Sequence, residues 1–228
     1  MVNRHGPFFL AGALALALTT PPKAQAGDVK GAVRSDETPK AKAADAARTP
    51  YYQEWNGFIE PKKSSVDYPR EVAVVLVGSV GNKDASLVTL QNGTLTPSTV
   101  VVQQGSSLRI RNQDDFSHKL TSDKLKGFDA VSTSPGQSRE LPMLETGHFA
   151  VVDKVAPHVK GFVHVLAKVT AVTAPQADGS FAFKDVPAGK YTLLVFRGGA
   201  EVSSQEIDVG SSGSVNLETV SVEFKSGK

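Results

Sequence analysis

Few side chains in this sequence can do chemistry, and cysteine is absent from all 228 residues. Without a thiol there is no thiolate nucleophile, no thiolate metal ligand and no disulfide. The five histidines form no His-Glu-x-x-His motif, and there is no Gly-rich phosphate loop and no nucleophile elbow around a Ser or Thr. Asp114 and Asp115 precede His118, and a solvated turn is a simpler interpretation of them than a catalytic pair. We therefore expect no enzyme activity.

The N-terminus has the pattern of an export signal. Arg4 precedes an apolar run from Phe8 to Leu18, and Ala24-Gln25-Ala26 fits the small-x-small rule for cleavage. The run is shorter than the roughly 20 residues that span a bilayer. We predict a signal peptide over residues 1–26 and a periplasmic or secreted protein with no membrane span after cleavage. The alternative is an N-terminal anchor that stays uncleaved.

The charge balance argues against a nucleic-acid partner. Of the 25 basic residues, Arg4 and Lys23 lie before the predicted cleavage site, which leaves 23 basic residues against 23 acidic ones. The remaining chain has no basic stripe that could neutralise phosphates. We expect the partner to be another exported or envelope protein.

The hydrophobic pattern after residue 70 is that of β-strands. Residues 70–78 form a continuous apolar run, as in a strand covered on both faces, and residues 107–111 alternate between polar and apolar. Further short strands are expected over residues 87–90, 99–103, 149–152 and 162–166. Short strands separated by turns at this spacing predict an all-β fold of sandwich modules.

Two segments resemble the cupredoxin family. "LTPSTVVVQQGSSLRIRNQDDFSHKL" (residues 95–120) is similar to the family's opening strands, and "SPGQSRELPMLETGHFAVV" (134–152) is similar to the strands before its ligand loop. The resemblance implies a Greek-key unit, to which we assign residues 87–172. It places His118 at the position of the first copper ligand.

The ligand loop departs from the family's pattern. The resemblance aligns Asp153-Lys154-Val155-Ala156-Pro157 with the family's Cys-x-x-His-Pro, and Val159 with the Met that follows. A blue copper site needs a thiolate, two imidazoles and a weak axial ligand. The resemblance therefore implies a cupredoxin-like fold with a degenerate copper site, and we expect no cofactor.

A rebuilt metal site is the competing hypothesis. On the same alignment His118, Asp153 and His158 could converge, and two imidazoles with one carboxylate suit Zn²⁺ or Cu²⁺. His148 and His164 lie on the strands that flank the loop. We do not expect them to be ligands, because strand alternation separates neighbouring side chains onto opposite faces.

A second resemblance begins at residue 177. "ADGSFAFKDVPAGKYTLLVF" is similar to the signature of carboxypeptidase regulatory-like domains, which are small transthyretin-like sandwiches, and Asp178-Gly179 predicts a hairpin turn. The strands that normally precede this signature resemble residues 27–33 and 71–78. We predict one discontinuous domain from residues 27–86 and 173–228, with the cupredoxin-like unit inserted. The alternative is a tandem arrangement, in which the cupredoxin-like unit precedes the other domain.

Aromatic residues concentrate between residues 51 and 58. Tyr52, Trp55 and Phe58 are candidate partner contacts, because Trp and Tyr dominate binding hot spots. The alternative is a lid packed on a sandwich face. Together these features predict an exported, non-catalytic binding or scaffold protein. The alternative is a copper or zinc carrier, or an electron-transfer protein of the cupredoxin type.

Overall fold

The computed structural model describes residues 26–35, 66–211 and 213–222. Their regular structure is almost entirely β, with one short helix, α3 (Tyr68–Glu71). The predicted all-β fold is confirmed. The predicted signal peptide lies almost wholly outside the described residues, and Tyr52, Trp55 and Phe58 also lie outside them. Within the described ranges, no helix is long and apolar enough to cross a membrane.

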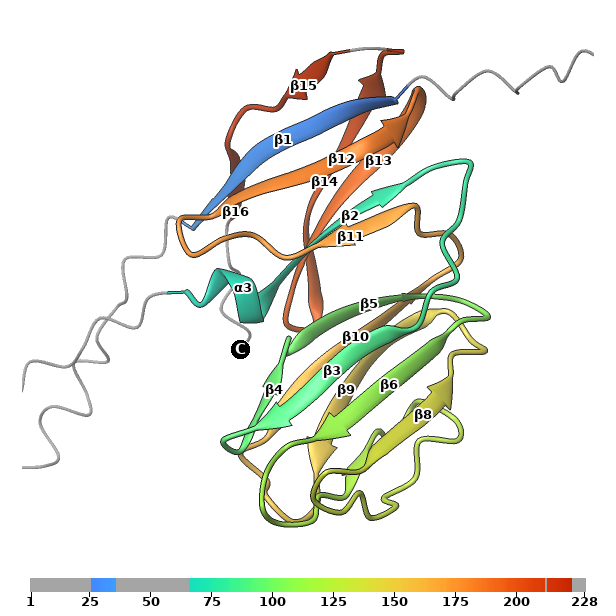
Figure 1. Ribbon diagram of the computed structural model, residues 1–228, viewed down its shortest axis with the longest axis vertical. Helices are drawn as coiled ribbons and strands as arrows, with labels where there is room; N and C mark the ends of the chain where they lie inside the picture. Colours follow the sequence, from blue (N-terminus) through green and yellow to red (C-terminus); the bar gives the residue numbers. More distant parts are fainter. Residues whose placement is uncertain (1–25, 36–65, 212, 223–228) are drawn as a thin grey trace, which may run out of the picture.

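The lower half of Figure 1 is one β-sandwich. Its two sheets have the strand orders β4-β3-β6-β8 and β5-β10-β9-β7. The strands are β3 (Ser86–Gln91), β4 (Thr94–Thr96), β5 (Thr99–Gln103), β6 (Ser107–Asn112), β7 (Leu120–Thr121), β8 (Ser138–Pro142), β9 (Gly147–Asp153) and β10 (Lys160–Leu166). In β6 the alternation predicted from sequence is found, since Leu108 and Ile110 are buried in the core between the sheets while Arg109 and Arg111 are exposed.

The upper half of Figure 1 is a second sandwich. One sheet has the order β12-β1-β15, with β16 also paired to β1, and the other has the order β11-β2-β13-β14. The strands are β1 (Ala26–Ser35), β2 (Val72–Val77), β11 (Ala171–Thr173), β12 (Ser180–Pro187), β13 (Gly189–Arg197), β14 (Ala200–Val209), β15 (Ser214–Asn216) and β16 (Val220–Val222).

Segments far apart in sequence build the upper sandwich. β1 pairs antiparallel with β12, where Val29 lies opposite Phe183, and β2 pairs antiparallel with β13, where Val74 lies opposite Val195. All four side chains share one core. The predicted pairing of the early strands with the C-terminal ones is confirmed. The predicted turn at residues 178–179 forms, since the Gly179 N–H donates to the backbone oxygen of Gln176 at 2.9 Å, but β11 before it pairs with β2 and β12 after it pairs with β1, so the turn crosses between sheets.

The lower sandwich lies between two neighbouring strands of the upper one. The chain leaves the upper sandwich after β2 and returns through β11, and these strands are antiparallel neighbours with Leu76 opposite Ala171. The two ends of the intervening segment therefore lie side by side, the geometry in which a loop tolerates a long insertion.

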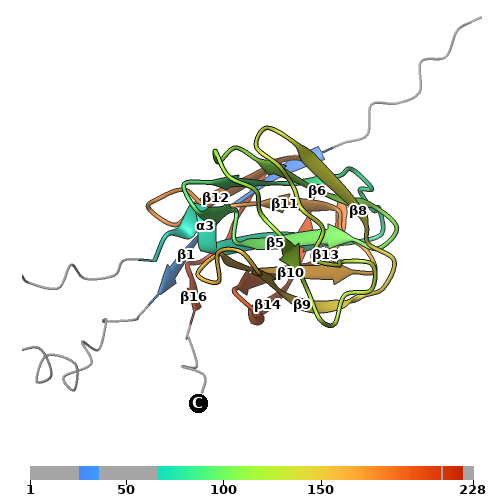
Figure 2. The same ribbon diagram turned by 90° about the horizontal axis from the view of Figure 1, so that it is seen from below.

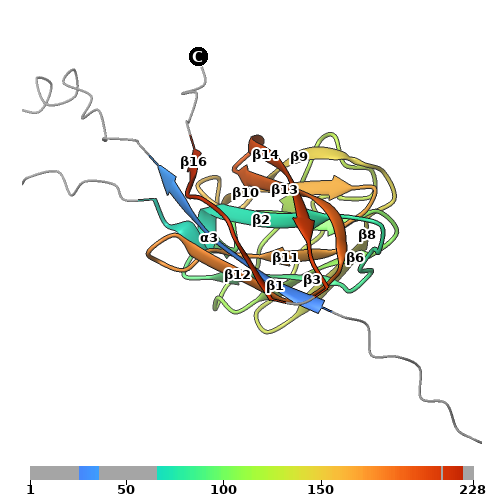
Figure 3. The same cartoon turned by 90° about the horizontal axis from the view of Figure 1, so that it is seen from above.

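The two sandwiches share a buried junction. Ala73, Val75, Val101, Val169 and Phe196 form a separate apolar cluster contributed by β2, β5, β13 and the segment before β11. This cluster explains why β2 reads as a continuous apolar run: one face serves the upper core and the other serves the junction. Seen along the long axis, the two sandwiches overlap (Figures 2 and 3).

Hydrogen bonds add to the apolar contacts of the junction. The Thr99 hydroxyl donates to the backbone oxygen of Glu71 at 2.6 Å and accepts from the backbone N–H of Gly198 at 2.9 Å. Thr99 lies on β5 of the lower sandwich, whereas Glu71 and Gly198 belong to the upper one. Polar groups in this contact are therefore paired across the junction.

Candidate functional site

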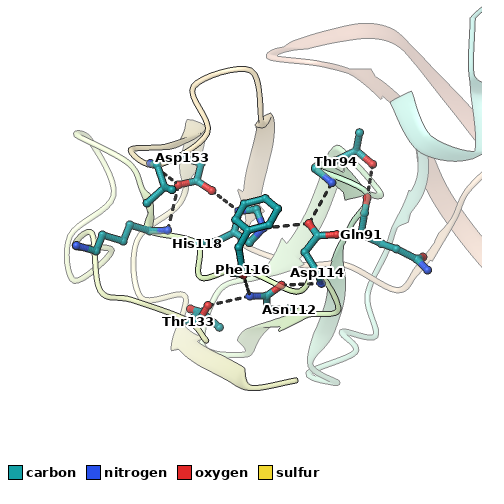
Figure 4. Close-up of polar contacts among 11 residues, drawn as sticks. Gln91, Thr94, Asn112, Asp114, Phe116, His118, Thr133 and Asp153 are labelled. Carbon is teal, nitrogen blue, oxygen red and sulfur yellow. Dashed lines mark hydrogen bonds and ion pairs between the residues drawn. The ribbon is translucent and has the colours of Figure 1, made fainter. Parts of the chain in front are cut away.

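A buried asparagine shapes the loop that carries His118. The Asn112 side chain donates to the backbone oxygens of Phe116 at 2.8 Å and Thr133 at 2.9 Å, and it accepts from the backbone N–H of Asp114 at 2.9 Å (Figure 4). His118 then forms two backbone hydrogen bonds with Thr133. These contacts fix the direction in which the His118 ring leaves the loop.

His118 is fully buried, and each of its ring nitrogens contacts a carboxylate. Nδ1 is hydrogen-bonded to Oδ2 of Asp153, which ends β9, and Nε2 lies 3.0 Å from Oδ2 of Asp114 (Figure 4). We call Asp114, His118 and Asp153 the carboxylate–histidine network. It ties three segments together, because Asp114 also accepts from the backbone N–H of Gly93 in the turn between β3 and β4, at 3.0 Å.

Backbone donors complete the surroundings of Asp153. Its second oxygen, Oδ1, accepts from the N–H groups of Val155 at 2.8 Å and Lys119 at 3.0 Å. Burial alone would raise the pKa of Asp153, but the hydrogen bonds from Val155, the His118 ring and Lys119 outweigh it and hold the pKa below its ordinary value. Both oxygens of this carboxylate are therefore engaged within the protein.

The structure brings together two of the three residues predicted as metal ligands. His118 and Asp153 are in contact, while His158 is exposed and its Nε2 lies beside Gly93, in the turn that binds Asp114. Across the described parts of the chain, no group of three or more His, Asp or Glu side chains is arranged to hold a metal ion.

Asp114 is the member of the network that sequence reasoning missed. Its side chain is only 7% exposed and contacts His118, so its interpretation as a solvated turn residue is wrong, whereas Asp115 is exposed as expected. The sequence feature that could have indicated this contact is the spacing Asn112-x-Asp114, with His118 four residues after Asp114. A short polar side chain that organises its own loop can turn a nearby carboxylate inward.

The donor set at this position does not fit blue copper. There is no thiolate, and the one buried imidazole has both nitrogens engaged by carboxylates. The positions aligned with the second His and with the axial Met are Ala156 and Val159, and both side chains are buried in the core of the lower sandwich. Blue copper requires a thiolate and two imidazoles, so these residues cannot form a blue copper centre.

A second histidine contact lies at the other end of the same strands. His148 on β9 and His164 on β10 are directly opposite in register, and their Nδ1 atoms are 2.6 Å apart. Alternation along one strand does not keep these two residues apart, because residues directly opposite on paired strands share a face. The sequence does not specify the β9–β10 register, and it is this register that places His148 opposite His164.

Comparison with known proteins agrees with the architecture of the lower sandwich. Residues 73–165 match the family described as cupredoxin-like domain. The match begins in β2, which pairs within the upper sandwich. No curated protein matches the chain.

Three solved structures illustrate the similarity of the chain to known proteins. Amicyanin from Paracoccus versutus is 17% identical over 36% of this chain and 81% of its own, with a TM-score of 0.33. A purple cupredoxin from Nitrosopumilus maritimus is 18% identical over 36% of this chain and 99% of its own, with a TM-score of 0.32. A Cu-containing nitrite reductase from Thermus scotoductus SA-01 is 16% identical over 36% of this chain, with a TM-score of 0.33, and the chain spans only 22% of that protein. On the strength of the family match, the chain contains a cupredoxin-like domain at residues 73–165.

Proposed function

We propose that this is an exported, non-catalytic binding or scaffold protein, whose cupredoxin-like domain is held together at the copper position by the carboxylate–histidine network. The observation that carries the proposal is that each ring nitrogen of His118 faces a carboxylate. Each nitrogen is paired with a carboxylate inside the protein, so a metal ion would have to break one of these buried contacts in order to bind His118.

The network also makes the connections that a bound ion would make. It joins the turn at Gly93, the loop that carries His118 and the end of β9. A metal centre joins loops by coordination, and here buried hydrogen bonds join them. The loops at this end can therefore keep a fixed shape without a cofactor.

Apolar side chains beside the network support a binding role. Phe116 is 41% exposed and packs on His118 with ring centroids 4.4 Å apart, and Val155, which donates its N–H to Asp153, is 50% exposed. Exposed apolar groups on loops held by a rigid network suit contact with another protein. We propose an exported or envelope protein as that partner, in keeping with the export signal read from residues 1–26.

We further assign the upper sandwich to the carboxypeptidase regulatory-like type. The pairing of β1 with β12 and of β2 with β13 supplies the strands that its C-terminal signature lacks. Domains of this type commonly act as accessory modules, which agrees with a protein that binds rather than catalyses.

The first test is addition of Cu²⁺ to the purified protein. We expect no intense blue absorption, because that colour comes from a copper–thiolate bond and the chain has no cysteine. We also expect the copper affinity of the His118→Gln variant to equal that of the parent. An intense blue band would contradict the proposal. Tight binding that His118→Gln abolishes would show a metal carrier instead, and a further loss in His158→Ala would assign His158 to the same site.

A further inference from the structure

The His148–His164 pair is a second place where imidazoles converge, away from the carboxylate–histidine network. His148 stands near the start of β9, and Asp153 of the network is five residues further along, roughly 17 Å at the rise of a strand. The two Nδ1 atoms point at each other across the β9–β10 pairing, 2.6 Å apart. The proposed function rests on the carboxylate–histidine network and does not involve this pair.

His164 is held in the tautomer that a metal ligand needs. The ring is buried and packs on Phe196 with centroids 4.4 Å apart, and Nε2 is 2.7 Å from the backbone oxygen of Gly198, to which it donates. With its hydrogen on Nε2, a neutral imidazole has its lone pair on Nδ1, which faces His148. Metal-binding histidines commonly donate their other N–H to a backbone carbonyl in this way.

Burial also keeps His164 neutral. Burial is the largest influence on the pKa of His164. The hydrogen bond to Gly198 raises this pKa and the charge of His148 lowers it, and the net result is a pKa of about 4.

His148 gives access from solvent. It is exposed on β9, and its ring meets the His164 ring edge-on, with centroids 4.8 Å apart. When its hydrogen is on Nε2, its Nδ1 lone pair points to the same spot as that of His164. The site thus combines one fixed, buried ligand with one exposed ligand that can adjust.

We propose that His148 and His164 bind one divalent transition-metal ion through their Nδ1 atoms, with Cu²⁺ preferred over Ni²⁺ and Zn²⁺. Imidazole nitrogens suit these three ions, and Cu²⁺ stands highest in the order of affinity. Two metal–nitrogen bonds of about 2.0–2.1 Å place cis nitrogens about 3 Å apart, so the pair has to open by only a few tenths of an ångström. No third His, Asp or Glu among the described residues completes the site, so water or a ligand from solution takes the remaining positions.

Metal binding at this pair preserves the junction between the sandwiches. His164 donates to Gly198 through Nε2 and would bind the ion through Nδ1, so the two contacts do not compete. A ligand that binds the folded state and not the unfolded one raises stability. Binding should therefore raise the melting temperature.

The test is calorimetric titration of the full chain, without a polyhistidine tag, with Cu²⁺ and separately with Ni²⁺. For the parent we expect one equivalent of Cu²⁺ to bind at this pair and Ni²⁺ to raise the melting temperature. His148→Ala should weaken Cu²⁺ binding at least tenfold and remove the thermal shift, whereas His158→Ala and His118→Gln should leave both unchanged. His148 is exposed, so its substitution is compatible with folding.

Two outcomes would overturn the inference. One is equal Cu²⁺ affinity in the parent and in His148→Ala. The other is absence of binding by the parent, which would leave the pair as a hydrogen bond only. Loss of binding in His118→Gln alone would count against the proposed function and not in favour of this site, so the two proposals fail separately.

Discussion

Replacing His118 with Ala should lower the free energy of unfolding by about 2–4 kcal/mol, because each buried carboxylate that loses a hydrogen-bond partner costs about 1–3 kcal/mol. The substitution leaves Asp114 and Asp153 facing each other with the imidazole gone from between them. It also removes the group that links the loop after β6 to the end of β9. Urea unfolding of parent and variant measures the difference.

The control for this prediction is the neighbouring Asp115→Ala. Asp115 is exposed, and surface substitutions of this kind usually change stability by less than about 0.5 kcal/mol. A double-mutant cycle with His118→Gln and Asp153→Asn should give a coupling energy on the order of 1–3 kcal/mol, because the two side chains are in direct contact. Additive effects, or a His118→Ala variant as stable as Asp115→Ala, would show that the network contributes no stability.

The second large effect is a loss of stability in acid that depends on His164. Burial first, and the nearby His148 after it, lower the pKa of His164 to about 4 despite the hydrogen bond to Gly198. In the unfolded chain the pKa is about 6.5. The stability that follows from this difference is therefore fully present above about pH 6.5 and is lost as the pH falls toward about 4. The loss approaches about 1.4 kcal/mol per pH unit and totals about 3 kcal/mol.

The measurement is the free energy of unfolding from pH 7 to pH 4, in the presence of a metal chelator. His148 is the titratable group in contact with His164, and the Glu71–Arg197 ion pair lies at the same junction. Since carboxylates titrate in the same range, the informative quantity is the difference between the parent and His164→Gln. The variant should show the flatter profile, and the exposed-histidine variant His158→Ala should follow the parent. Parallel profiles for the parent and His164→Gln would contradict the assignment.

The strands could be predicted from sequence because their signals are local. Alternation in β6 and the continuous apolar run of β2 follow from which faces are covered, and both are found as expected. The pairing of β1 with β12 also followed from sequence, because a C-terminal signature without its leading strands requires them from elsewhere. The strand pairing around residues 178–179 could not be predicted, because a turn dipeptide does not reveal whether the next strand stays in the same sheet.

The site could be predicted only in part because its contacts depend on register and on loop shape. The contact between His118 and Asp153 follows from aligning the loop with a known family. The burial of Asp114 depends on how Asn112 folds the loop, which no short pattern specifies. The approach of His148 to His164 depends on the β9–β10 register, in which a shift of one residue would place the rings on opposite faces.

The central claim is that the carboxylate–histidine network stands where a cupredoxin holds copper. The most direct test is a crystal structure determined after soaking with Cu²⁺, with anomalous diffraction recorded at the copper absorption edge. We predict direct contacts of the His118 ring with Asp114 and Asp153, with no copper peak bonded to His118. A peak at His148 and His164 would leave the claim intact. A copper ion bonded to Nδ1 of His118, with Asp153 displaced or acting as a ligand, would contradict it.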